Sequence, residues 1–349
     1  MKKEFPEFYR LEKDEITALW EGCIFAFDAN VLLNLYRYSL DTSDNLISIL
    51  KNFSDRIWIP HQFALEYQRN RMVVIEGQRV KYLGSIKNIL GELDVVEELL
   101  GNYYGKMPFD LDKLRDELKK SQEEYPGCTA EDKMRDEIDA LFKDKVGSPF
   151  DDKRLSVVVE EGKDRYQKEI PPGYCDASEK DKKDPTKTKK YGDLIGWLQM
   201  IEKAKTEKKP LVFITSERKE DWWQIVKGKT VGPRHELLKE FQKETGETFH
   251  MYDMKRFLDY AKEKYTVTKK TIDEVTKVDE VYNTIVASER GAVVVGGPIP
   301  ELSDNQVNLV DWPITDISSS MADVEKESPW LIVPEAEGGI DGLATGGKV

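Results

Sequence analysis

The stretch FAFDANVLLNLYR, residues 25–37, decides the fold because an apolar run ends at Asp28 and resumes in a helical pattern after Asn30. A short apolar run of this kind is typical of a buried central strand. Such a strand does not normally leave a carboxylate at its tip unless something positively charged binds there. We therefore expect Asp28 to lie at the carboxyl end of a strand and to face a cation.

Length and composition narrow the class of protein. The chain has 349 residues, enough for one large domain or two smaller ones. It has no apolar stretch of about 18 residues, and its N-terminus lacks the apolar core of a signal peptide. Its three cysteines are far apart, which argues against a disulfide framework or a zinc site, and its three histidines are scattered. We expect a protein of the cytoplasm, without a membrane partner, whose chemistry depends on carboxylates.

Charge is distributed unevenly along the chain. The net charge is −13, but residues 301–349 alone carry ten Asp and Glu against two Lys. A lysine cluster lies at residues 180–190, KDKKDPTKTKK. This cluster is either a solvated loop or a basic edge that binds phosphate, and in the second case Lys187, Lys189 and Lys190 would contact nucleic acid.

Alternating strand and helix patterns predict an α/β fold with a mainly parallel sheet, because the connections are too long for hairpins. The predicted strands are 23–28, 56–60, 210–216 and 248–253. The predicted helices are 40–50, 61–77, 191–209, 234–246 and 254–265.

The same patterns suggest how the chain is divided. Residues 1–76 and 171–265 form the two halves of the α/β domain, and 77–170 form an inserted arm of charged helices. Within that arm only LSVVVEE, residues 155–161, has a strand-like pattern, and 170–190 reads as a loop. Residues 266–349 are expected to be an acidic, partly flexible C-terminal region, in which GAVVVGGPIPEL, 291–302, could form a strand.

Five acids are expected to meet at one edge of the sheet, where chemistry collects in open parallel sheets. They are Asp28, Glu66, Asp193, Glu217 and Asp221. Each has an ordinary alternative: a strand-end turn for Asp28, an ion pair with Arg69 for Glu66, and a helix cap for Asp193. Together, however, like charges repel unless they are protonated or neutralised. Oxygen-only ligands favour Mg²⁺ or Mn²⁺, ions that activate water and bind phosphodiesters.

Five ordered motifs within residues 20–265 resemble PIN-domain ribonucleases, in particular a PIN-like subfamily with a long helical insertion. The motifs are FDANVLLNLYR, IPHQFALEYQRNR, PPGYCD…YGDLIGW, VFITSERKEDWW and GPRHELLKEF. The resemblance implies a PIN-like three-layer sandwich with an inserted helical arm. It also implies a nuclease that depends on Mg²⁺ or Mn²⁺ and acts on nucleic acid, with RNA as the expected substrate. A role as a toxin or in antiviral defence is typical of such proteins.

The resemblance also assigns roles to residues. Asp28, Glu66 and Asp193 match the first three metal-binding acids of the family. Glu217 stands where a fourth acid, usually aspartate, is found, and Asp221 is the reserve for that role. Asn30 and Thr215 match polar residues that support the acids. Three arginines lie in the matching motifs and could bind phosphate: Arg69, Arg71 and Arg234.

Two rival functions remain open at this stage. A phosphatase of the haloacid-dehalogenase type would explain the strands FAFDAN and LVFITS, but it needs an acid where Asn30 stands. A PIN-like module that only binds nucleic acid or protein would fit the unusual Glu217. The arm or the acidic tail could also mediate self-association or hold a protein partner. The pair Trp222–Trp223 either stacks on bases or packs in the core.

Overall fold

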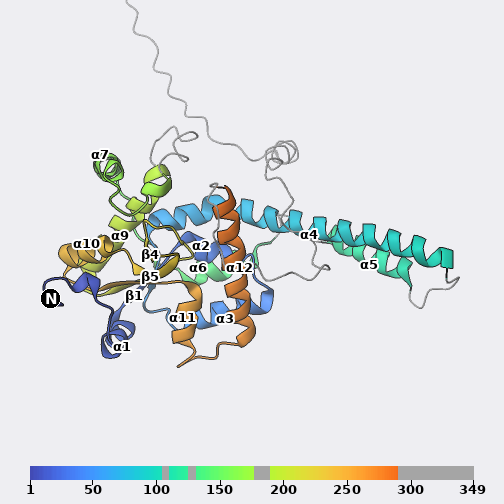
Figure 1. Cartoon of the computed structure of the whole chain (residues 1–349), viewed down its shortest axis with the longest axis horizontal. Helices are drawn as coiled ribbons and strands as arrows, with labels where there is room; N and C mark the ends of the chain where they lie inside the picture. The colour runs from blue at the N-terminus through green and yellow to red at the C-terminus, as the bar shows by residue number, and fades with distance from the viewer. Residues whose placement is uncertain (104–109, 125–130, 177–188, 290–349) are drawn as a thin grey trace, which may run out of the picture. The chain divides into compact units, whose positions relative to one another are not determined.

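A four-stranded parallel sheet forms the centre of the computed structural model, which describes residues 1–103, 110–124, 131–176 and 189–289 (Figure 1). Its strands are β1 (Ile24–Phe27), β2 (Ile57–Trp58), β3 (Leu211–Ile214) and β6 (Phe249–Tyr252). Their order is β2-β1-β3-β6, and every neighbouring pair is parallel. From β1 the chain first adds β2 on one side of β1 and then adds β3 on the other side. The direction of strand addition therefore reverses between β1 and β3. In open parallel sheets this reversal opens a crevice at the carboxyl ends of the strands.

Helices cover both faces of the sheet and make the three layers that the sequence predicts. On one face, Phe25 of β1 packs edge-on against Phe53, which follows α3, and against Phe257 of α11. On the other face, Phe213 of β3 stacks on Phe63 of α4. The helices of these layers are α1 (Lys13–Gly22), α3 (Leu40–Lys51), α4 (His61–Tyr103), α9 (Gly192–Glu207), α10 (His235–Thr245) and α11 (Met254–Ala261). The predicted α/β class and parallel sheet are confirmed.

A small antiparallel hairpin, β4 (Trp223–Val226) and β5 (Lys229–Pro233), follows β3. Its turn residues Lys227 and Gly228 both have positive φ, as a two-residue hairpin turn requires. Trp222 and Trp223 are each only 2 % exposed. Both tryptophans therefore pack in the core, and the alternative of base stacking is excluded for this conformation.

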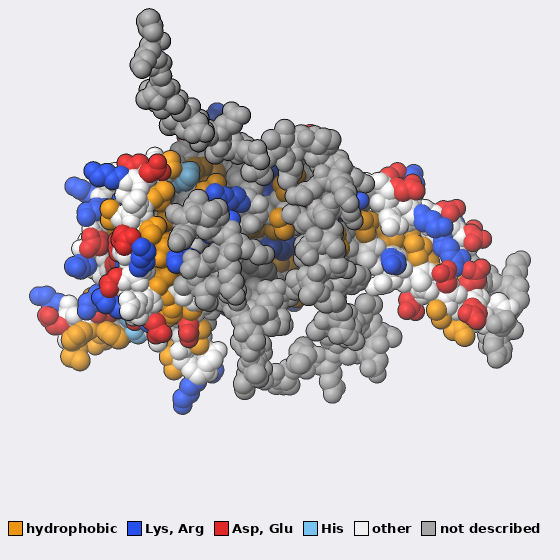
Figure 2. Space-filling view, turned by 90° about the horizontal axis from the view of Figure 1, so that it is seen from above, with side chains coloured by type: hydrophobic (Ala, Val, Ile, Leu, Met, Phe, Trp, Pro, Cys, Tyr) orange, Lys and Arg blue, Asp and Glu red, His pale blue; other side chains and the backbone are white. Residues whose placement is uncertain are grey.

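The long helix α4 continues past the sheet and pairs with α5 (Leu111–Glu124). The pairing is antiparallel, because the Tyr82 hydroxyl bonds to that of Ser121 while Arg115 pairs with Asp94 and Glu97. On the visible face of this hairpin, blue and red side chains are interspersed (Figure 2). From here on, the arm means residues 77–124 alone, the first part of the insertion predicted at 77–170.

After the arm the chain rejoins the α/β body. Ile138 of α6 (Lys133–Leu141) and Val158 of α7 (Asp152–Gln167) are buried in the main core. Ile59, just after β2, forms a parallel bridge with Val146, so the chain returns beside the point where it left. The strand-like pattern at 155–161 proved wrong: it lies inside α7, which the Asp151 side chain caps.

The described part of the predicted C-terminal region begins with a helix. Residues after 266 include a helix, α12 (Lys269–Glu289), that packs on α3 and α11. Val275 of α12 is fully buried, and Glu274 accepts hydrogen bonds from the Ser39 and Thr42 hydroxyls at the start of α3. The predicted strand at 291–302 lies outside the described residues.

The short elements are η1 (Pro6–Phe8), α2 (Ala29–Asn34), η2 (Tyr174–Asp176) and η4 (Lys189–Tyr191). None of the described helices is both long and apolar enough to cross a bilayer.

Candidate active site

Asp28 ends β1 and starts α2, yet its side chain makes no capping hydrogen bond to that helix. The carboxylate instead accepts a 2.7 Å hydrogen bond from the hydroxyl of Thr215, at the end of β3, and a longer one of 3.5 Å from the Asn30 amide. Asp28 is 7 % exposed. Asp28 thus occupies the N-cap position of α2, but its carboxylate is buried and bonds to Thr215 instead of capping the helix.

Burial is the main reason why the pKa of Asp28 rises to about 6; the Thr215 hydrogen bond opposes this rise, and the negative charges of Glu217 and Asp193 add to it. Glu217 and Asp193 therefore act electrostatically on Asp28. The convergence of all five acids on one ion stays a prediction.

Asp193 lies in the first turn of α9, but the capping position belongs to Tyr191. Its Oδ2 atom is buried and has no hydrogen-bond partner among the described residues. The loop that contains Gly173 passes close to the Asp193 side chain. A Cβ atom at Gly173 would lie 2.9 Å from the Cβ of Asp193, so this neighbouring loop can approach only because Gly173, with φ +94°, has no side chain.

Glu66 reaches the same helix start from the second turn of α4. Its Oε1 atom accepts a 2.7 Å hydrogen bond from the amide of Gln62, one turn earlier. A Cβ atom at Gly192 would lie only 2.5 Å from that oxygen. Glu66 and Asp193 therefore sit on adjoining elements at the N-terminus of α9, and Gly192 makes the room for them.

Asp221 is fully buried and lies in the segment between β3 and β4. Its Oδ2 accepts hydrogen bonds from the backbone N–H groups of Gly173 (2.9 Å) and Cys175 (3.1 Å), while its Oδ1 is buried without a partner among the described residues. Burial, followed by the charge of Asp193, raises the pKa of Asp221 to about 6. Asp221 thus ties the loop that follows α7 to the edge of the acid cluster.

Glu217 is the acid whose oxygens are already occupied. Its Oε1 accepts from the backbone N–H groups of Arg218 and Lys219, and its Oε2 lies 2.5 Å from the Lys219 ammonium. Lys219 is a residue that the sequence reasoning missed. Its spacing of two residues from both Glu217 and Asp221 was the available signal.

A family model described as a PIN-like domain matches residues 24–237, more than half of the chain, and spans all five acids. The chain belongs to the PIN-like domain family. No curated protein and no solved structure matched it in the corresponding searches. PIN domains are generally nucleases. The family and the fold expected from the motifs are confirmed.

The PIN-like site has the donor chemistry for a hard divalent cation, since its groups are carboxylate, amide and hydroxyl oxygens. In the described part of the chain, no three Asp, Glu, His or Cys side chains are close enough to enclose a metal ion. The unpartnered, buried oxygens of Asp193 and Asp221 are the donors that fit an ion best.

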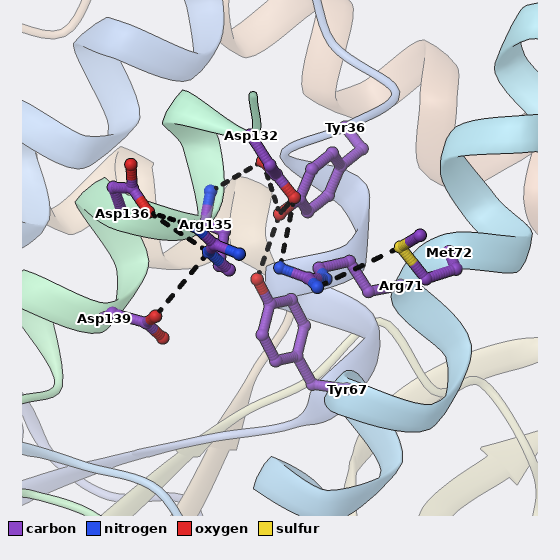
Figure 3. Close-up of polar contacts among 8 residues, drawn as sticks. All are labelled: Tyr36, Tyr67, Arg71, Met72, Asp132, Arg135, Asp136 and Asp139. Carbon is purple, nitrogen blue, oxygen red and sulfur yellow. Dashed lines mark hydrogen bonds and ion pairs between the residues drawn. The ribbon is translucent and has the colours of Figure 1, made fainter. Parts of the chain in front are cut away.

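The predicted phosphate-binding residues of this PIN-like chain differ in their surroundings. Arg71 points toward Asp132 in a cluster with Tyr36 and Tyr67, with Nη1 3.2 Å from the carboxylate (Figure 3). Arg234 makes a two-pronged ion pair with Glu236, which is the main reason why its pKa is raised.

The other basic candidates are more open. Arg69 and Lys189 are exposed, and the Lys190 ammonium lies 5.1 Å from the centre of the Tyr191 ring. Lys187 lies outside the described residues. A contact of any of these side chains with nucleic acid stays a prediction.

Proposed function

We propose that this PIN-like chain is a divalent-metal-dependent nuclease that hydrolyses phosphodiester bonds, with RNA as its substrate. The observation that supports the proposal is the burial of Asp28 and Asp221, together with the buried, unpartnered oxygens Oδ2 of Asp193 and Oδ1 of Asp221, in three distant segments of the chain. Burying such groups without a counter-ion is costly, and the raised pKa values of Asp28 and Asp221 reflect that cost.

In this proposal Asp28, Glu66 and Asp193 hold Mg²⁺ or Mn²⁺, with Asp221 or Glu217 completing the site. A bound ion of this kind supplies Lewis acidity and lowers the pKa of water. The chain's own residues set the geometry. Thr215 fixes the Asp28 carboxylate, and the backbone N–H groups of Gly173 and Cys175 fix Asp221.

Exposed basic side chains near the start of α9 and on α4, Lys189 and Arg69, would contact substrate phosphates. Their contribution would weaken with added salt because it depends on displacing counter-ions. The preference for RNA rests on the family. The proposal also includes a location in the cytoplasm and a role as a toxin or in antiviral defence.

The second candidate function is a PIN-like module that binds nucleic acid or protein without cleaving it. The ion pair that already occupies Glu217 favours this alternative, because it removes one acid from metal binding. A dehalogenase-type phosphatase loses its support, because the family match extends across Glu66 and Asp193, which that reading does not use.

A manganese titration with labelled RNA and DNA in one mixture tests the proposal. Wild type should cleave RNA in a Mn²⁺-dependent way, and Asp28→Asn and Asp193→Asn should each lose activity by at least about 100-fold. Asp112→Asn is the matched control, because this carboxylate is 92 % exposed on the arm. If nucleic acid binds equally well in EDTA and no product forms, the binding module is the correct function.

A further inference from the structure

Lys219 is a lysine held inside the acid cluster rather than on the surface. Its side chain is only 12 % exposed. Its backbone N–H donates to Glu217, and its carbonyl accepts from the N–H groups of Trp222 (3.1 Å) and Trp223 (3.0 Å), both of which are buried. The backbone of Lys219 is therefore held on both sides, and its ammonium is ion-paired with Glu217.

The charge of Lys219 acts on the other acids of the cluster. The Lys219 ammonium lowers the pKa of Asp221, whereas burial and the charge of Asp193 raise it. Glu217, the partner of Lys219 at 2.5 Å, is linked to Asp28 through Thr215, whose hydroxyl accepts from the Glu217 N–H and donates to the Asp28 carboxylate. Lys219 thus lies in the segment that joins Thr215 to Asp221.

The two sides of the site differ in what they offer a cation. On one side, Asp193 Oδ2 and Asp221 Oδ1 are buried carboxylate oxygens without a hydrogen-bond partner among the described residues. On the other side, both oxygens of Glu217 are bound, one by two backbone N–H groups and one by Lys219. A divalent ion that bound Oε2 of Glu217 would have to displace the Lys219 ammonium, which lies 2.5 Å away.

We propose that the Lys219 ammonium is a built-in cation that takes the place of a second divalent metal, so that the centre binds one ion and Lys219 itself contacts the scissile phosphate. An ammonium donates hydrogen bonds to phosphate oxygens and neutralises their charge without dissociating from the protein. Glu217 is then the residue that positions Lys219, which explains a glutamate where the resemblance leads one to expect an aspartate ligand. This inference rests on the proposed nuclease function and assigns a role within the same site.

The test counts the Mn²⁺ ions bound per chain at saturation, by electron paramagnetic resonance of free Mn²⁺, and measures RNA cleavage in parallel. Wild type and Lys219→Arg should each bind one ion. Lys219→Met leaves the Glu217 carboxylate without its cation and should bind a second ion, while kcat falls by about 100-fold. The double variant Glu217→Gln/Lys219→Met removes both charges and should bind one ion again.

Lys262→Met is the matched control, because Lys262 is also ion-paired, at 2.6 Å with Asp259, but is half-exposed on α11. It should bind one ion and cleave normally. Two ions in wild type, or an unchanged count and kcat in Lys219→Met, would overturn the role of Lys219 while leaving the nuclease intact. If wild type binds no Mn²⁺ and cleaves nothing, both proposals fall. If Lys219→Met does not fold, the double variant and Lys219→Arg decide, because a second ion in either contradicts the proposal.

Discussion

At the scale of single residues, the site combines buried carboxyls with one hydroxyl that contacts two of the acidic residues. Thr215 donates to Asp28, and its hydroxyl also accepts from the backbone N–H of Glu217, so one side chain orders two acids. Asp28 and Asp221 both have a pKa of about 6, against an ordinary value of 3.8. In the metal-free protein these two groups therefore bind protons more tightly when folded than when unfolded.

The first prediction concerns pH. A carboxyl whose pKa rises on folding contributes stability that is complete below about pH 4 and is lost as the pH rises through about 6. Without metal, Asp28→Asn should be more stable than wild type at pH 8, by up to about 3 kcal/mol, because it removes a buried charge. At pH 4 the two proteins should be equally stable. Thermal unfolding in EDTA at both pH values measures this, and an advantage that is the same at both would contradict the raised pKa.

The second prediction concerns Gly192. In Gly192→Ala the new methyl group would lie 2.5 Å from Oε1 of Glu66, the end of a flexible side chain that can move away. We expect the free energy of unfolding to change little, while Mn²⁺ affinity falls about ten-fold, as is typical when the surroundings of a ligand are altered. Isothermal titration measures the affinity.

Gly91→Ala is the control for this substitution, because nothing lies within 4 Å of a Cβ atom at this helical glycine of the arm. It should be slightly more stable than wild type, by about 1 kcal/mol, with unchanged affinity. If Gly192→Ala and wild type bind Mn²⁺ with equal affinity, Glu66 is not a ligand of the metal ion.

How far the sequence predicts the site depends on the range of the interaction. Asp28 and Thr215 could be placed together because parallel strands end at the same edge, a rule that holds whatever the side chains are. The pairing of Glu217 with Lys219 could not, because the direction of a side chain in an irregular segment depends on packing that the sequence does not show. The same limit applies to Arg71, whose partner Asp132 lies beyond the arm.

At the scale of elements, α12 is the segment that sequence patterns describe least well. Its Asp279 is 2 % exposed and lies 3.2 Å from the Asn34 amide and from the hydroxyl of Ser216, the residue after Thr215. A helix outside the matched region thus contacts the end of β3. In α7 the sequence pattern suggested a strand where the structure has a helix. The valines at 157–159 favour a strand locally, but the Asp151 cap and the burial of Val158 stabilise the helix.

The third prediction tests how α12 is attached. Val275→Ala should reduce the free energy of unfolding by about 2 kcal/mol, because Val275 is fully buried and its truncation leaves a cavity. Val281→Ala in the same helix should have almost no effect, because that side chain is 50 % exposed. Urea denaturation of both variants provides the comparison; equal effects would mean that α12 is not held against the core.

At the scale of the whole molecule, the described contacts divide the predicted insertion into two parts. Residues 77–124 form the arm, with Ile86 and Leu111 buried outside the main core, whereas Ile138 and Val158 belong to that core. We propose that the catalytic body extends to the end of α12, so that the acidic C-terminal region starts later than residue 266. Residues 1–292 form one compact unit.

The fourth prediction compares two shortened chains, one ending at residue 292 and one ending at residue 268. The first keeps α12 and should unfold at the wild-type temperature. The second loses the buried Val275 and Asp279 and should be destabilised by several kcal/mol, on the order of two core truncations. If the acidic residues beyond 292 inhibit the enzyme by imitating nucleic acid, the first chain will also turn over RNA faster than the full chain. Unchanged turnover would count against this inhibition.

The bridge between Ile59 and Val146 has a consequence for how this protein could have diversified. Two backbone hydrogen bonds, from the Ile59 N–H to Lys145 and from the Gly147 N–H to Ile59, join the two ends of the segment 60–145. The entropy needed to close a loop grows only slowly with its length, so lengthening or trimming the distal part of α4 and α5 would leave the sheet almost undisturbed. Natural variants could therefore exchange this projection for others of different length while keeping the edge of the sheet that carries the acids intact.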